Sequence, residues 1–199
     1  MARQTLIWAF VIAAIMVAVV AAGMSPLLAW RDPIYIVAGF AGIAAMVLLL
    51  IQPLLAAGDL PGLVGIRGRR MHRWIGAGLV LAVVVHVVGL WLTSPPDVVD
   101  ALTFSSPTPF SVWGVIAMWA VFAAAGLAAL RRRLRLPPRV WLIGHMSLTA
   151  MVVGGTVVHA MLIDGTMEWF SKAFLCAVTL GVTIKVIFER RARLGIKKL

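Results

Sequence analysis

The strongest constraint on this chain is a series of six long apolar runs separated by short polar turns. A helix needs about 20 apolar residues to cross about 30 Å of hydrocarbon, and every run approaches or exceeds that length. Hydrophobic residues make up 62% of the 199 residues and charged residues only 13%, against about 45–50% and about 25% in soluble domains. The pattern predicts an all-α polytopic membrane protein, a six-helix bundle forming one domain over residues 1–199. The runs are Thr5–Gly23, Pro33–Ala57, Met71–Thr93, Ser111–Leu130, Arg139–Ile163 and Phe170–Phe188.

The polar gaps are too short to hold a soluble domain. The longest extends from Ser94 to Phe110, far below the size of a nucleotide-binding domain. We therefore expect no flavin or nicotinamide domain beside the helices, and we take the first run as a retained span because no clear cleavage site follows it. The single cysteine, Cys176, cannot form an internal disulfide.

The net charge of +11 does not indicate a nucleic-acid partner, because the cations lie at the ends of apolar runs. Such clustering is typical of cytoplasmic loops, so we expect a multi-pass protein of a bacterial inner membrane with both termini cytoplasmic. The expected cytoplasmic cations are Arg3, Arg67, Arg69, Arg70, Arg73, Arg131, Arg132, Arg133, Arg135, Arg139, Arg190, Arg191, Arg193, Lys197 and Lys198. The opposite side carries Arg31 and Lys172 with Asp32, Asp97, Asp100, Asp164 and Glu168.

The four histidines all lie in the third and fifth runs, as two pairs with equal spacing. His72 and His86 are 14 residues apart, as are His145 and His159. Fourteen helical residues advance about 21 Å and about four turns, so both histidines of a run lie on one helix face. The two runs are parallel, so His72 can face His145 near the cytoplasmic side and His86 can face His159 near the outer side.

Two facing imidazole pairs favour bis-axial ligation of two b-type haems, with all four histidines as iron ligands. Small residues one turn from each histidine, at Gly76, Ala82, Thr149 and Gly155, would let a porphyrin approach the helices. A six-coordinate haem has no open position and therefore transfers electrons. Three alternatives are a cofactor-free transport or scaffold bundle with histidines bonded between helices, a proton relay, and a zinc site. The last two fit less well, because the acids lie at span ends and the imidazoles are spread over about 21 Å.

The stretch Arg69-Arg70-Met71-His72-Arg73-Trp74-Ile75-Gly76, followed by His86-Val87-Val88-Gly89, resembles the ferric reductase-like transmembrane domain family. That superfamily includes ferric reductases, the membrane half of NADPH oxidases and the haem-binding membrane subunit of the bacterial methionine-sulfoxide reductase system. The resemblance covers about the second to fifth runs. It implies a six-helix bundle holding two stacked b haems, with His72 and His145 as the inner pair, His86 and His159 as the outer pair, and electrons passing outward.

Because we expect no nucleotide domain beside the helices, we also expect a separate electron donor, either a soluble reductase, a flavin on a partner or a quinol. Possible acceptors are ferric iron, oxygen or a periplasmic redox protein, the last including a methionine-sulfoxide reductase. Haem propionates prefer cations, so Arg70, Arg73 and Arg139 are candidates beside the inner pair, and Arg31 and Lys172 beside the outer one. The basic, glycine-rich stretch 58–70 could hold a flavin head group, although a positive cytoplasmic loop explains it better.

Overall fold

The computed structural model describes residues 2–165 and 167–193. Lys197 and Lys198, counted above among the cytoplasmic cations, lie outside the described residues. Within that range the chain forms only helices, which confirms the all-α prediction. They are α1 (Ala2–Gly23), the 3-10 turn η1 (Pro26–Leu28), α2 (Pro33–Ala57), α3 (Gly65–Thr93), α4 (Pro95–Leu102), α5 (Pro109–Leu134), α6 (Pro138–Leu162) and α7 (Trp169–Arg193).

Six of these helices are long and apolar enough to cross a membrane, as the six apolar runs predict. The short helix α4 was not expected, because prolines and polar residues obscure its apolar face. Helix α3 begins at Gly65, six residues before the predicted Met71. The prediction rested on the apolar residues of α3, which are the part that can lie in hydrocarbon. The first turns of the same helix are rich in arginine, so the apolar run did not include them.

Local chemistry explains where α2 begins and ends. The Asp32 carboxylate accepts a hydrogen bond from the Ile34 amide at 2.7 Å, which caps the helix before Pro33 takes its first position. Gly58 ends the helix in the left-handed conformation at φ 79°, where a residue with a Cβ would be strained. These two signals give α2 the bounds that the sequence predicts.

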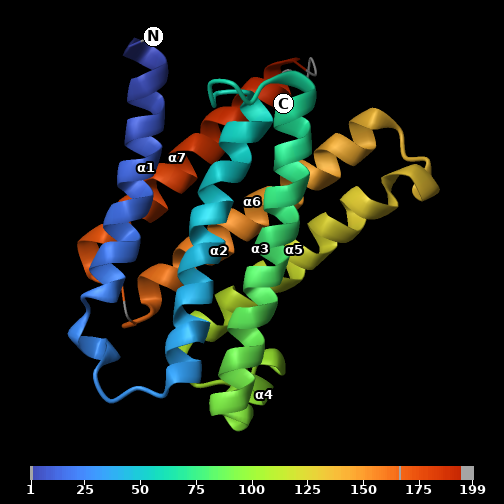
Figure 1. The fold of residues 1–199 in the computed structure, drawn as a ribbon. Coiled ribbons are helices and arrows are strands. Elements are labelled where there is room, and N and C mark those ends of the chain that lie inside the picture. The colour runs from blue at the N-terminus through green and yellow to red at the C-terminus, as the bar shows by residue number, and fades with distance from the viewer. Residues whose placement is uncertain (1, 166, 194–199) are drawn as a thin grey trace.

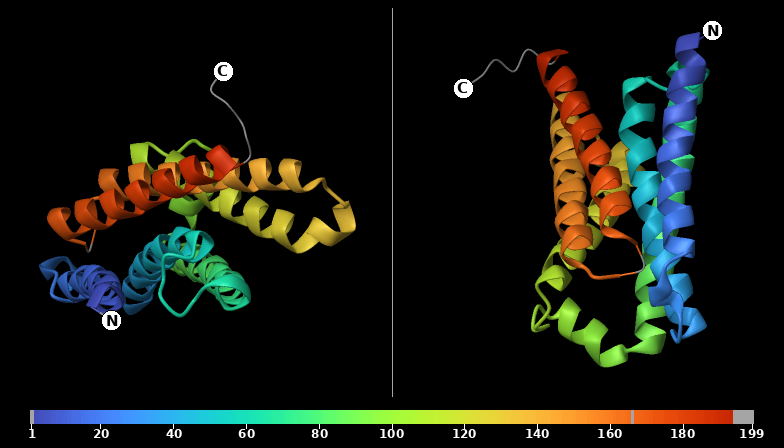
Figure 2. Two further views of the ribbon diagram at one scale, coloured as in Figure 1. Left: turned by 90° about the horizontal axis from the view of Figure 1, so that it is seen from above. Right: turned by 90° about the vertical axis from the view of Figure 1, so that its left-hand side faces the viewer.

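The helices form two layers of three (Figures 1 and 2). One layer contains α1, α2 and α3, and the other contains α7, α6 and α5. Within the layers α2 packs against α3, and α5 against α6, while α2 and α1 contact α7 across them. Helices α3 and α6 belong to opposite layers, so their inward faces can meet without close backbone packing.

Charge distinguishes the two ends of the bundle. We call the end where α3 and α6 begin the basic end, and the other end the acidic end. The start of α1 and the end of α7 lie at the basic end (Figure 1). The basic end carries Arg67, Arg69, Arg70, Arg73, Arg131, Arg132, Arg133, Arg135 and Arg139, and the acidic end carries Asp32, Asp97, Asp100, Asp164 and Glu168.

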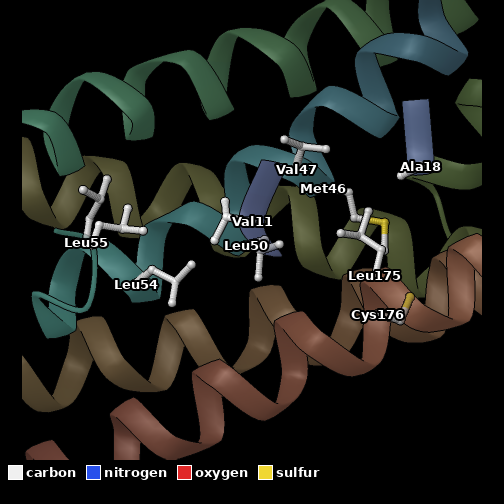
Figure 3. Close-up of a cluster of buried hydrophobic side chains, with 10 residues drawn as sticks. Val11, Ala18, Met46, Val47, Leu50, Leu54, Leu55, Leu175 and Cys176 are labelled. Carbon is white, nitrogen blue, oxygen red and sulfur yellow. The ribbon is translucent and has the colours of Figure 1, made fainter. Parts of the chain in front are cut away.

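Two apolar clusters hold the layers together. The larger joins α1, α2 and α7 and includes Leu50, Leu54 and Leu175 (Figure 3). The smaller joins α2, α3, α5 and α6 through Leu49, Leu79, Ala120, Val121, Val152 and Val153. This second cluster ties α3 to α6 and fixes the space in which their histidines face one another.

Candidate functional site: two pairs of facing histidines

The first pair of histidines lies toward the basic end, on the facing sides of α3 and α6. The ring centres of His72 and His145 are 6.3 Å apart, with their planes at 69°. A metal ion bound to two imidazole nitrogens, each about 2 Å away, would place the ring centres about 6 Å apart. The separation of this pair therefore suits one metal ion between two axial imidazoles.

The second pair, His86 and His159, lies toward the acidic end of the same two helices. Both rings are partly buried, and each bonds to a backbone carbonyl of a neighbouring helix. His86 Nδ1 donates to the Ala38 oxygen of α2 at 2.7 Å, and His159 Nδ1 donates to the Phe110 oxygen of α5 at 2.8 Å.

These bonds determine which nitrogen of each ring is available. A carbonyl oxygen can only accept, so Nδ1 carries the proton in His86 and His159, and also in His72, whose Nδ1 lies 3.2 Å from the Gln52 carbonyl. The neutral ring then has its lone pair on Nε2. Metal-bound histidines almost always donate their other ring N–H in this way, so three of the four imidazoles are prepared as Nε2 ligands.

His145 is held differently. Its buried Nδ1 has no hydrogen-bond partner, and its ring stacks on Trp141 at 5.3 Å with an interplanar angle of 8°. The Arg131 guanidinium lies 4.2 Å from the centre of the Trp141 ring. Stacking, instead of a hydrogen bond, therefore fixes the orientation of the His145 ring.

Gln52 supports the first pair from α2. Its side-chain Nε2 donates to the His72 carbonyl at 3.2 Å, while its own carbonyl accepts from the His72 ring. The side chain is only 8% exposed, and its Oε1 has no partner. This reciprocal contact fixes His72 at both its backbone and its ring.

Two glycines lie directly beneath the rings of the second pair. A Cβ added to Gly42 of α2 would lie 3.0 Å from His86 Nδ1, and one added to Gly114 of α5 would lie 2.7 Å from His159 Nδ1. The distance at Gly114 is shorter than real Cβ contacts, and the distance at Gly42 is tighter than most of them, so a side chain at either position would require the ring to shift.

The smaller apolar cluster lies between the two pairs. Leu79 is seven residues from both His72 and His86, and Val152 is seven residues from both His145 and His159. Both belong to that cluster, which separates two sites instead of leaving one continuous cavity. The described residues contain no group of three or more histidine, cysteine or acidic side chains able to hold a metal ion, so paired ligation is the chemistry that the histidines offer.

The small residues beside the histidines have packing partners within the protein. A Cβ on Gly76 would lie 2.9 Å from Gln52 Nε2, and one on Gly155 would lie 3.0 Å from the Trp113 carbonyl. Gly155 is buried and permits close approach of α5 and α6, while Thr149 bonds to the His145 carbonyl at 2.8 Å. Helix packing thus accounts for Gly155, and the porphyrin contact assigned to Gly76 and Gly155 stays a prediction.

The cations considered for propionates fall into two groups. Arg70, Arg73 and Arg139 are exposed at the basic end, near the His72–His145 pair along the chain. At the acidic end Lys172 is buried and donates to the Ile163 carbonyl at 2.6 Å, while Arg31 lies over the Tyr35 ring. The two acidic-end cations therefore already have partners, although Arg31 is exposed, as are the three basic-end arginines.

Sequence reasoning did not assign Gln52, Gly42, Gly114, Trp141 or Arg131 to the surroundings of the histidine pairs. A glutamine before Pro53 within an apolar run is a usable signal, because a polar amide in hydrocarbon needs a partner. Gly42 and Gly114 gave no such signal, since glycine is common in membrane helices and their partners are on other helices.

Comparison with known protein families identifies the family to which the chain is similar. The family described as "Ferric reductase like transmembrane component" matches residues 38–156, more than half of the chain. The matched range contains His72, His86 and His145 and ends three residues before His159. No curated protein and no solved structure matches the chain.

Proposed function

This chain belongs to the ferric reductase-like transmembrane component family, and from this membership we propose that it carries electrons across a bacterial inner membrane through two b-type haems. His72 and His145 would hold one haem, and His86 and His159 the other. A six-coordinate haem b supplies a one-electron couple without an open coordination position. The observation that carries the proposal is the 6.3 Å separation of the His72 and His145 rings, together with the Nδ1 bonds that leave Nε2 as the ligand atom.

The residues of the chain would perform distinct tasks. The Ala38, Gln52 and Phe110 carbonyls hold three rings in the ligating tautomer. The apolar cluster around Leu79 and Val152 keeps water out of the space between the two sites. The exposed arginines Arg70, Arg73 and Arg139 are the proposed partners of anionic propionates at the basic end.

We place the basic end in the cytoplasm, following the excess of arginine there. A soluble reductase, a partner-bound flavin or a quinol would deliver electrons at that end. Ferric iron, oxygen or a periplasmic redox protein such as a methionine-sulfoxide reductase would receive them at the acidic end.

The competing function, a cofactor-free transport or scaffold bundle, uses the same Nδ1 bonds for helix association alone. It gives no reason for the rings of His72 and His145 to face one another with their centres 6.3 Å apart. The two functions can be distinguished by reconstituting the protein into vesicles that hold a reductant inside and a membrane-impermeant ferric complex outside. The measurement is the reduction of the external complex.

We expect the wild-type protein to reduce the external complex and His86→Leu to lose that activity. Exposed Gln4 provides the control, because Gln4→Leu leaves both histidine pairs intact and should retain activity. Equal external reduction by wild type and His86→Leu would contradict the proposed path.

A further inference from the structure

The two histidine pairs differ in how strongly their rings are bonded to the protein. In the acidic-end pair, both Nδ1 atoms donate to carbonyls, at 2.7 Å for His86 and 2.8 Å for His159. In the basic-end pair, His72 makes a longer bond of 3.2 Å and His145 Nδ1 has no partner. The acidic-end imidazoles therefore have the stronger hydrogen bonds.

One local arrangement, repeated on two helices, produces these short bonds. Gly42 follows Ala38 by four residues on α2, and Gly114 follows Phe110 by four on α5. Residues four apart lie above one another on a helix face, so each ring rests on the glycine and reaches the carbonyl one turn earlier. The corresponding residue after Gln52 is Ala56, which has a side chain, and the His72 bond is longer.

Hydrogen bonding at Nδ1 changes the basicity of the other ring nitrogen, Nε2. Donation to a strong acceptor makes the imidazole a more basic ligand, which stabilises ferric over ferrous iron and lowers the reduction potential. Charge acts in the same direction, because the acids at the acidic end outnumber the cations Arg31 and Lys172 there, whereas arginines predominate at the basic end. Negative charge opposes the gain of an electron, and positive charge favours it.

We infer that Gly42 and Gly114 are positioning residues that make the acidic-end haem the lower-potential haem of the two. The inference rests on the proposed function, because it concerns haems held by these four histidines. Each electron moving outward would then pass from the higher-potential to the lower-potential haem. The membrane potential, negative inside, assists that movement of negative charge, so an energised membrane would speed outward transfer.

The test is a redox titration of the purified full-length protein, followed by its haem absorbance. His86→Leu assigns the potentials, because it removes a ligand of the acidic-end haem only. We expect the wild type to titrate with two reduction potentials, one for each haem. In His86→Leu we expect a single potential that matches the higher of those two. A single potential matching the lower one would overturn the inference.

Alanine variants test the glycines themselves. Gly42→Ala and Gly114→Ala should push the ring from its carbonyl and raise the lower potential, or release that haem alone. Gly126→Ala on α5 is the control, since a Cβ there meets nothing within 4 Å, and it should change neither potential. Retention of both haems with unchanged potentials in Gly42→Ala and Gly114→Ala would refute the positioning role. Wild-type protein without haem would instead refute the proposed function.

Discussion

At the scale of single residues, the orientation of the histidine rings depends on the backbone carbonyls around them as well as on the spacing of the histidines in the sequence. The 14-residue intervals place the rings at two heights, and carbonyls on α2 and α5 then fix their tautomers. These carbonyls belong to ordinary helical residues, so their role has no side-chain signature. The facing of His72 and His145 could be predicted from the sequence, but the groups that orient the histidine rings could not, and the role of the four histidines as iron ligands stays a prediction.

Gln52 offers a test at this scale. Gln52→Leu keeps side-chain bulk but removes the hydrogen bond to the His72 carbonyl. A net hydrogen bond contributes about 1 kcal/mol, or about a fivefold change in an equilibrium constant. We expect the basic-end haem to dissociate about fivefold more readily, as measured by transfer of haem to an apoprotein acceptor.

The matched control for this prediction is Gln4→Leu, at an exposed position of α1. It should release haem at the wild-type rate. Identical rates for Gln52→Leu and Gln4→Leu would show that the Gln52 amide does not support His72.

At the scale of helices, close approach of α5 and α6 depends on one member of an adjacent glycine pair. A Cβ on Gly155 would lie 3.0 Å from the Trp113 carbonyl and 3.1 Å from the Ala117 Cβ, whereas one on Gly154 meets nothing within 4 Å. Gly155→Ala should destabilise the protein by about 1–3 kcal/mol through overpacking. Gly154→Ala should be neutral or stabilise it by up to about 1 kcal/mol.

Denaturant or thermal unfolding of the two variants measures this difference. Because His159 lies one turn beyond Gly155, Gly155→Ala should also lower occupancy of the acidic-end haem. If both alanine variants unfold like the wild type, packing does not explain Gly155 and its predicted contact with a porphyrin gains support.

Helix α7 is capped by Glu168, the acid immediately before its first residue. The exposed Glu168 carboxylate accepts hydrogen bonds from the Phe170 and Ser171 amides at 2.8 and 3.0 Å. Protonation of the carboxylate would weaken these bonds, and they therefore lower the pKa of Glu168. A carboxylate whose pKa is lower in the folded than in the unfolded protein stabilises the fold at any pH above its unfolded-state pKa. This stabilisation is lost as the pH falls through its folded-state pKa.

We therefore expect the melting temperature of the wild type to fall as pH drops below the ordinary glutamate range. Glu168→Gln should melt lower at neutral pH and show a smaller decrease on acidification. Asp164→Asn, at an exposed acid in the same connection, should keep the wild-type pH dependence. A Glu168→Gln curve parallel to that of the wild type would contradict the capping role.

At the scale of the whole molecule, the apolar runs predicted six spans and the fold contains them. The helix α4 and the early start of α3 were not predicted, because both lie where polar or proline-rich sequence hides a helical period. The pairing of α2 with α3 and of α5 with α6 in two layers depends on side-chain fit between helices. One sequence does not show that fit, so Gly42 and Gly114 could be recognised only in the folded chain.

The orientation of the bundle can be tested with single cysteines, because native Cys176 is buried. Ser105 is exposed at the acidic end and Arg132 at the basic end. A membrane-impermeant thiol reagent should label Ser105→Cys in cells with an intact inner membrane, and Arg132→Cys only after that membrane is opened. The reverse labelling pattern would place the basic end outside and reverse the proposed direction of electron flow.

The central claim is that two facing pairs of imidazoles each hold one haem. It is tested most directly by the ratio of haem to protein after purification from cells supplied with haem. We expect about two haems b per chain in the wild type and about one in His86→Leu, each with the spectrum of bis-histidine iron. Colourless wild-type protein, or a ratio that His86→Leu leaves unchanged, would contradict it.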